Sequence, residues 1–100
     1  MPKKRIISLA ESAFADLQNI LVWYKDQQVP DAGESLVREI IAKMERLADF
    51  PESGRIVPEF GIANLREIIF PSYRIVYRLD VHAIKVVRVW RSERLLKTPE

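Results

Sequence analysis

The sequence contains no cysteine and no long apolar run, and each absence excludes a class of protein. Without cysteine, the chain can form neither a disulfide nor a zinc site built on thiolates, which fits a reducing compartment. No apolar run approaches the roughly 18 residues that a membrane-spanning helix needs. The apolar stretch that follows the basic N-terminus, Ile6-Ile7, is too short for a signal peptide. We therefore expect a cytoplasmic protein that has no membrane partner.

The motifs of cofactor-dependent and hydrolytic enzymes are also missing. There is no glycine-rich phosphate loop, no dinucleotide-binding fingerprint, no serine nucleophile elbow and no His-Glu metal motif. The single histidine, His82, lies between two predicted strands and is interpreted as an exposed turn residue. The sequence therefore predicts no cofactor, no metal and no histidine-based acid–base mechanism.

The length and the charge of the chain limit its architecture and its partners. One hundred residues, 48% hydrophobic and 30% charged, suit a single globular domain over residues 1–100. Residues 1–54 contain seven Lys and Arg against nine Asp and Glu, a net charge of −2, whereas residues 55–100 contain nine against five, a net charge of +4. Because arginine grips phosphate or carboxylate with a planar fork, this basic half is either a solvated surface or a surface that binds anions. Its arginines are Arg55, Arg66, Arg74, Arg78, Arg88, Arg91 and Arg94.

The first half of the chain has the periodicity of two amphipathic helices. Apolar residues recur at intervals of three and four over residues 14–24 and again over residues 36–48. Pro30 separates the two stretches, and Asp31 is placed to cap the second helix. A short link between helices predicts an antiparallel hairpin. The predicted apolar stripes contain Phe14, Leu17, Leu21 and Tyr24, and then Leu36, Ile40, Ile41, Met44, Leu47 and Ala48.

The second half changes to the period of two that is typical of β-strands. We predict strands at 65–70, 73–79 and 83–91, and a short edge strand at 4–9. The connections between the last three strands are short turns, which require antiparallel neighbours. Alternation places Tyr73, Ile75, Tyr77 and Leu79 on one face against Arg74, Val76 and Arg78, and it groups Ile84, Val86, Arg88 and Trp90 opposite Lys85, Val87, Val89 and Arg91.

These elements define an α+β fold in the order β-α-α-β-β-β. We expect an N-terminal strand and a two-helix hairpin packed on a twisted antiparallel sheet of three to four strands. A hairpin of helices can cover only one face of such a sheet. The other face is then free to bind a partner, and the basic residues are expected to lie there.

Glu59 and Arg66 are the first candidates for chemistry, and two interpretations of them stay open. In one, Glu59 or Glu67 forms surface ion pairs with nearby arginines, each worth at most about 1 kcal/mol. In the other, Glu59 accepts a proton and Arg66 stabilises an oxyanion.

Four segments of the sequence resemble the RelE/ParE toxin superfamily. The segment FPESGRIVPE at residues 50–59 is similar to the family pattern "FP…GR.VPE". The segments LREI at 65–68 and YRIVYR at 73–78 resemble its "REI…YRIVYR" core, and VVRVWRSER at 86–94 resembles its last strand and the basic motif that follows. The resemblance covers nearly the whole chain in the right order. It implies a helical hairpin packed on a twisted antiparallel sheet.

The resemblance also implies the toxin of a type II toxin–antitoxin pair, whose partner is a cognate antitoxin that folds as it wraps the toxin. RelE-like members cut messenger RNA at the ribosome, whereas ParE-like members inhibit DNA gyrase and need no nuclease site. Our leading hypothesis is therefore a ribosome-dependent mRNA endonuclease, and the alternative is a non-catalytic inhibitor of DNA gyrase. A third hypothesis is an inactivated toxin that only binds its antitoxin.

The resemblance to the RNA-cutting members implies a role for each candidate residue. Glu59 matches a general base and Arg66 a phosphate-binding arginine, while Arg91 or Arg94 would hold the phosphate or steady the leaving group. Many members carry a histidine or tyrosine just after the last strand, where this chain has Arg91 and Ser92. Arginine is a poor proton donor, with a pKa above about 12, so its role would be charge stabilisation. The other residues expected to bind RNA or phosphate are Arg55, Arg74, Arg78, Arg88 and Arg94.

Overall fold

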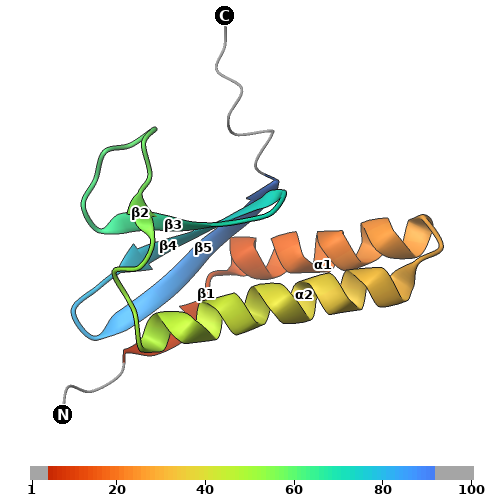
Figure 1. The fold of residues 1–100 in the computed structure, drawn as a ribbon, viewed down its shortest axis with the longest axis horizontal. Coiled ribbons are helices and arrows are strands. Elements are labelled where there is room, and N and C mark those ends of the chain that lie inside the picture. The colour runs from red at the N-terminus through yellow and green to blue at the C-terminus, as the bar shows by residue number, and fades with distance from the viewer. Residues whose placement is uncertain (1–4, 92–100) are drawn as a thin grey trace, which may run out of the picture.

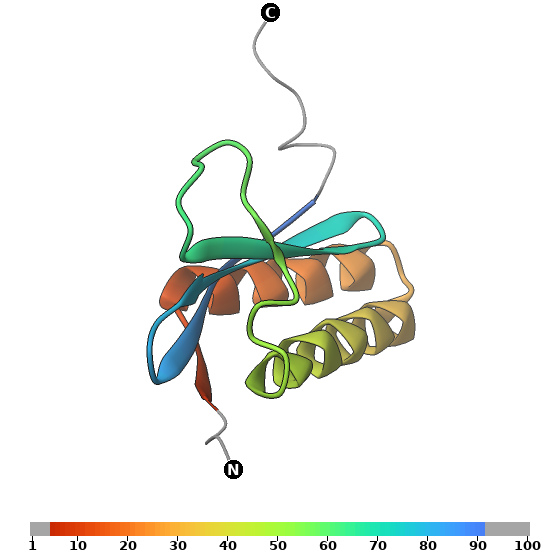
Figure 2. The ribbon, with the colours of Figure 1, turned by 60° about the vertical axis from the view of Figure 1, so that its left-hand side comes forward.

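The computed structural model describes residues 5–91 and places two helices against one face of a five-stranded sheet (Figure 1). Figure 2 shows the helices on one side of the sheet and the loop between β2 and β3 projecting from the other side. The elements are β1 (Ile6–Leu9), α1 (Glu11–Asp26), α2 (Pro30–Glu45), the short 3-10 helix η1 (Arg46–Ala48), β2 (Arg55–Ile56), β3 (Leu65–Phe70), β4 (Tyr73–Leu79) and β5 (Ala83–Arg91).

The sheet confirms the predicted α+β class and adds to it. Its strand order is β1-β5-β4-β3-β2, and β1 runs parallel to β5 while the other pairs are antiparallel. The sheet is therefore mixed and has five strands, where an antiparallel sheet of three to four was expected. The extra strand, β2, is only two residues long, which is too short to show any alternation in the sequence.

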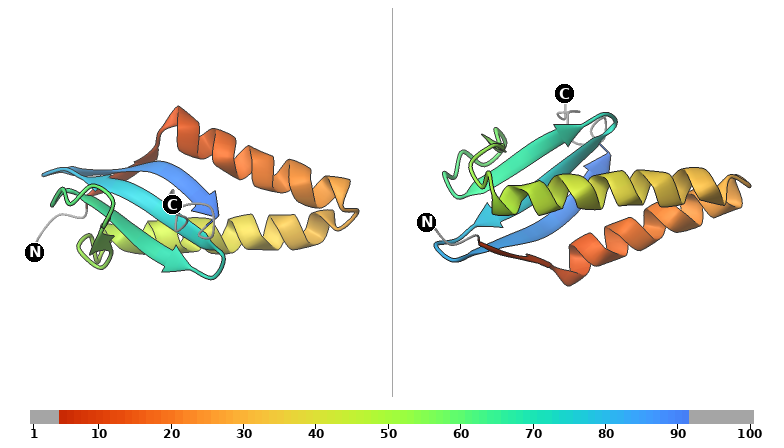
Figure 3. Two further views of the ribbon diagram at one scale, coloured as in Figure 1. Left: turned by 90° about the horizontal axis from the view of Figure 1, so that it is seen from above. Right: turned by 60° about the horizontal axis from the view of Figure 1, so that its bottom comes forward.

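The two helices form the predicted antiparallel hairpin, with two differences in detail. Helix α2 begins at Pro30, so Asp31 lies in its first turn and makes no capping hydrogen bond. Its carboxylate favours the positive end of the helix dipole instead. Helix α1 buries Ala13, whereas the neighbouring Phe14, expected in the core, is 56% exposed. The helices extend beyond the sheet at the end where they are joined (Figure 3), and neither is long and apolar enough to cross a membrane.

The core fills the space between the helical hairpin and one face of the sheet. Because Val76 of β4 pairs with Arg88 and Tyr77 pairs with Val86, Val87 is an extra residue in β5. This bulge reverses the alternation of side chains along the strand. The predicted grouping of Arg88 and Trp90 with Ile84 was therefore wrong. The buried residues of the core are Ala13, Leu17, Ile20, Ile40, Met44 and Leu47 from the helices, and Tyr73, Ile75, Tyr77, Ile84, Val86 and Val89 from the sheet.

Candidate functional site

The face of the sheet turned away from the helices, here called the open face, carries most of the candidate arginines. Residues directly opposite each other on neighbouring strands share a face, and Tyr77 and Ile75 of β4 lie in the core. The alternate residues Arg74 and Arg78 therefore lie on the open face. The pairing of Arg74 with Trp90, of Val76 with Arg88 and Glu67, and of Glu67 with Arg55 extends this face over four strands.

Four charged residues of the open face form a chain of ion pairs, here called the ion network: Arg55, Glu59, Glu67 and Arg74. Arg74 donates from Nη1 and Nη2 to the two carboxylate oxygens of Glu59, at 2.8 Å each. Its Nε donates to Oε1 of Glu67 at 2.6 Å, and Nε of Arg55 donates to Oε2 of the same carboxylate at 2.7 Å. The side chains of Arg74 and Glu67 are 1% and 0% exposed. The surface ion pair expected for Glu67 is thus a buried one.

The ion network holds Glu59 as an anion. The hydrogen bonds from Arg74 lower the pKa of Glu59 to about 2, against a smaller opposing effect of desolvation. The same hydrogen bonds to Glu59 raise the pKa of Arg74. A carboxylate with a pKa near 2 that accepts two charge-assisted hydrogen bonds is a weak base at neutral pH. Glu59 in this arrangement is poorly suited to accept a proton from a ribose hydroxyl.

The other arginines of the open face are also matched with carboxylates. Arg88 donates from Nε and Nη2 to Asp16 of α1 at 2.8 and 2.9 Å, and Asp16 accepts a further bond from the backbone N–H of Val89. The pKa of Arg88 is raised, chiefly by the bond to Asp16. Arg78 lies 3.2 Å from Asp80 in an exposed pair. These contacts reduce the positive charge that the open face offers to a phosphate.

The remaining candidates lie elsewhere. Arg66 donates to the backbone carbonyl groups of Gly54 and Ala63, at 3.0 and 3.2 Å, so it ties together the chain on both sides of the β2–β3 loop. Arg91 lies with its guanidinium 5.9 Å from the centre of the Tyr73 ring. Arg94 lies outside the described residues.

The structure does not bring Glu59, Arg66 and Arg91 together. Arg66 pairs with Tyr77 and Arg91 with Tyr73, so both point to the helix side of the sheet, whereas Glu59 lies over the open face. The two paired tyrosines are four residues apart along β4, which separates the backbones of the two arginines by roughly 13 Å along the strand direction alone, and β4 lies between their strands. The two arginines therefore share a face but lie far apart on it, and Arg74 holds Glu59 over the opposite face.

The sequence gives no signal for one carboxylate in these contacts, Asp16, and only a hint that another, Glu67, is buried. Asp16 lies 72 residues from Arg88 and looks like an ordinary polar position on the first helix. Glu67 is a charged residue inside a strand that is otherwise apolar after Arg66, and this placement is the one hint that it is buried with a partner. Among residues 5–91, no group of three His, Asp or Glu side chains is placed to hold a metal ion.

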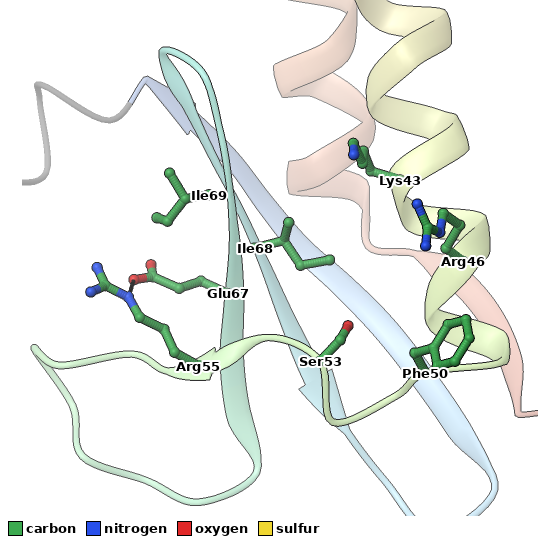
Figure 4. A pocket seen from close by; sticks show the side chains of 8 residues that line it. All are labelled: Lys43, Arg46, Phe50, Ser53, Arg55, Glu67, Ile68 and Ile69. Atoms are coloured by element: carbon green, nitrogen blue, oxygen red, sulfur yellow. Dashed lines mark hydrogen bonds and ion pairs between the residues drawn. The ribbon is translucent and has the colours of Figure 1, made fainter.

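A concave surface lies at the edge of the sheet beside the end of α2, and its lining runs from the helix side around β3 to Arg55 and Glu67 of the open face (Figure 4). It is a pocket of about 480 Å³ whose lining combines apolar and cationic side chains. The Nζ of Lys43 lies 6.0 Å from the centre of the Phe70 ring, and the guanidinium of Arg46 lies 6.0 Å from that of Phe50. The lining residues are Lys43, Arg46, Phe50, Ser53, Arg55, Glu67, Ile68 and Ile69.

Comparisons with known proteins agree with this fold. The sequence model of a family described as "ParE toxin of type II toxin-antitoxin system, parDE" matches residues 7–96. A solved structure described as "Chromosomal ParDE TA system from P. aeruginosa" is similar, with a TM-score of 0.75 and 19% sequence identity over 88% of this chain and 96% of the other. No curated protein matches the sequence.

Proposed function

We propose that this chain, which belongs to the ParE toxin family of type II toxin–antitoxin systems, halts growth by binding a protein target and not by cutting RNA. The observation that carries the proposal is the bidentate pair between Glu59 and the buried Arg74. This pair occupies both the predicted base and an arginine that could have gripped phosphate. Family membership also gives the chain an antitoxin as partner.

DNA gyrase is the target that we favour. The sequence resembles ParE-like toxins, and toxins that inhibit gyrase need no nuclease site. The alternative is a ribosome-dependent endonuclease that uses Glu59, Arg66 and Arg91. It would require Arg74 to release Glu59, and Arg66 to leave the carbonyl groups of Gly54 and Ala63. Breaking a bond to a charged group costs about 1.5–3 kcal/mol, and strand alternation would still leave the arginines on the other side of the sheet.

Two assays on the same purified protein test this proposal. The first measures supercoiling of a relaxed plasmid by DNA gyrase, and we expect inhibition that rises with toxin concentration. The second measures cleavage of a messenger RNA on translating ribosomes, and we expect the RNA to stay intact. Arg91→Ala gives the matched variant, because it removes a predicted nuclease residue that is exposed and lies at the end of β5.

The outcomes separate the two functions. Inhibition of supercoiling by both the wild type and Arg91→Ala supports a non-catalytic toxin. Messenger RNA cleavage by the wild type that is lost in Arg91→Ala would refute the proposal and restore the endonuclease. Induction of the chain in cells adds an independent readout, since gyrase inhibition arrests replication before translation.

A further inference from the structure

The β2–β3 loop, residues 57–64, projects from the side of the sheet opposite to the helices (Figure 2). Its sequence, VPEFGIAN, contains no lysine or arginine. It presents two large apolar side chains to solvent, Phe60 at 56% and Ile62 at 52% exposure. Between them Gly61 has a φ of 63°, a backbone conformation that glycine adopts readily.

The loop is held in place at both ends by backbone hydrogen bonds. The N–H groups of Phe60 and Gly61 both donate to the carbonyl of Val57, at 3.1 and 2.9 Å, and the side chain of Val57 is buried at 1% exposure. At the other end, Leu65 N–H donates to the carbonyl of Ile62 at 3.0 Å. These local hydrogen bonds constrain the backbone of the turn that carries the apolar side chains.

Side chains and the neighbouring strand fix the same loop to the sheet. Glu59 is gripped by Arg74 through two bonds of 2.8 Å, and Ala63 accepts a bond from Arg66 at 3.2 Å. The carbonyl of Asn64 accepts a bond of 2.7 Å from the N–H of Leu79 in β4. The residues that resemble a nuclease centre thus serve as supports of this loop.

We propose that Phe60 and Ile62 form a rigid apolar knob that inserts into an apolar pocket on the folded protein target of the toxin. This inference rests on the proposed function, because it requires a toxin that acts by binding a protein. Apolar side chains on a loop that is already ordered lose little conformational entropy on binding. Large side chains that fill a pocket at the centre of an interface commonly dominate its affinity.

The shape and the charge of the loop indicate the kind of partner. A nucleic acid is disfavoured because the loop has no cation to offer the phosphates. A segment that folds as it binds, as expected of the antitoxin, has no preformed pocket to accept a projecting side chain and suits a concave surface. The pocket between α2 and β3 is concave and carries Lys43 and Arg46. A folded target with its own pocket is the partner that fits the knob.

The test compares Phe60→Ser with Phe14→Ser, since the two phenylalanines have the same exposure of 56%. Ile62→Ser is the second knob variant. Each purified toxin is titrated against DNA gyrase in the supercoiling assay and against the cognate antitoxin by calorimetry. Thermal unfolding checks that all variants fold. We expect each knob variant to weaken gyrase inhibition on the order of 30-fold, and Phe14→Ser to inhibit like the wild type, with antitoxin affinity unchanged in all three.

Three results would overturn the inference: Phe60→Ser inhibits gyrase as the wild type does, Phe14→Ser loses as much inhibition as Phe60→Ser, or the knob variants lose antitoxin affinity while inhibition persists. Failure of the proposed function is distinguishable, because the wild type itself would then not inhibit gyrase. In that case growth arrest on induction of the same variants tests the knob alone. Arrest by Phe60→Ser at wild-type doses would refute it, and arrest lost only in the knob variants would support it for another protein target.

Discussion

Arg74 is the residue on which the charge balance of the open face depends. Its guanidinium is almost fully buried and contacts the carboxylates of Glu67 and Glu59. Glu67 is itself completely buried, and its second oxygen accepts a bond from Arg55. A buried charge is tolerated only when opposite charges and hydrogen bonds replace the water that it has lost. Removing one partner therefore leaves the other charges buried without the contacts that offset their desolvation.

We expect Arg74→Ala to lower the free energy of unfolding by about 3–5 kcal/mol, because it leaves the buried carboxylate of Glu67 without its main partner. Arg78→Ala is the matched control, since this arginine lies on the same strand and face but in an exposed pair with Asp80. Its cost should be at most about 1 kcal/mol. Urea denaturation of the three proteins measures both values. Equal losses in the two variants would contradict a buried ion network.

The pair between Glu59 and Arg74 should make stability depend on acid pH. The pKa of Glu59 falls from 4.5 to about 2 on folding, so its contribution is complete above about pH 4.5 and disappears as the pH falls toward 2. The side chain is 39% exposed, and solvent screening limits this contribution to about 1 kcal/mol. We expect Glu59→Gln to be less stable than the wild type at pH 7 by that amount.

The comparison of the two proteins as the pH is lowered tests the cause. The difference in free energy of unfolding between the wild type and Glu59→Gln should shrink between pH 5 and pH 2, as measured by urea denaturation at each pH. A difference that stays constant over this range would show that the carboxylate charge is not what stabilises the pair.

At the scale of elements, the approach to β2 depends on a glycine. A Cβ on Gly54 would lie 2.6 Å from the hydroxyl of Tyr77 and 2.7 Å from the carbonyl oxygen of Glu67. The same hydroxyl accepts a hydrogen bond from Gly54 N–H at 3.0 Å and donates one to the carbonyl of Pro51 at 2.8 Å. This contact joins the segment after η1 to the centre of β4, and through β2 it positions the β2–β3 loop.

We predict that Gly54→Ala lowers the free energy of unfolding by about 2–3 kcal/mol, because the methyl group overlaps with backbone that cannot move aside. Gly61→Ala is the comparison. A Cβ there meets no atom within 4 Å, so only the positive φ opposes it, at about 1 kcal/mol. Thermal unfolding ranks the two variants. A greater loss in Gly61→Ala would show that the contact with Tyr77 is not tight.

The elements themselves were largely predictable, and the exceptions have physical causes. The boundaries of β3, β4 and β5 follow from alternation and from the turns between them. The bulge at Val87 does not, because its sequence, Val86-Val87, fits either face equally well. Phe14 was expected in the core because it is apolar, but α1 buries Ala13 instead, where the small side chain permits close approach. In both cases, tertiary contacts and not the local sequence determined which side chains face the core.

At the scale of the whole molecule, most arginines of the basic half, residues 55–100, already contact a carboxylate. Three of the arginines expected to bind RNA, Arg55, Arg74 and Arg88, contact a buried or half-buried carboxylate, and Arg78 contacts an exposed one. The binding of a nucleic acid depends on cations that can replace counterions on the phosphates. A surface whose cations are already paired offers few of them.

We therefore expect weak binding to a single-stranded RNA oligonucleotide, with little dependence on salt. The double variant Asp16→Asn/Asp80→Asn should bind more tightly and with a steeper salt dependence, because it frees Arg88 and Arg78 and raises the formal net charge from +2 to +4. Fluorescence anisotropy at 50 and 200 mM salt measures both. Tight, salt-sensitive binding by the wild type would contradict internal neutralisation.

The sequence by itself determined the class of the fold, its helical hairpin, four of its five strands, including the N-terminal strand β1, and the family to which it belongs, because these depend on local periodicity and on segments read in order. Only the tertiary structure decided which carboxylates and arginines contact each other. Asp16 meets Arg88 across 72 residues, and Glu59 and Glu67 meet Arg74 from a loop and a neighbouring strand. The energy of interaction between two charges depends on the distance between them and on their burial, and neither can be deduced from the order of the residues.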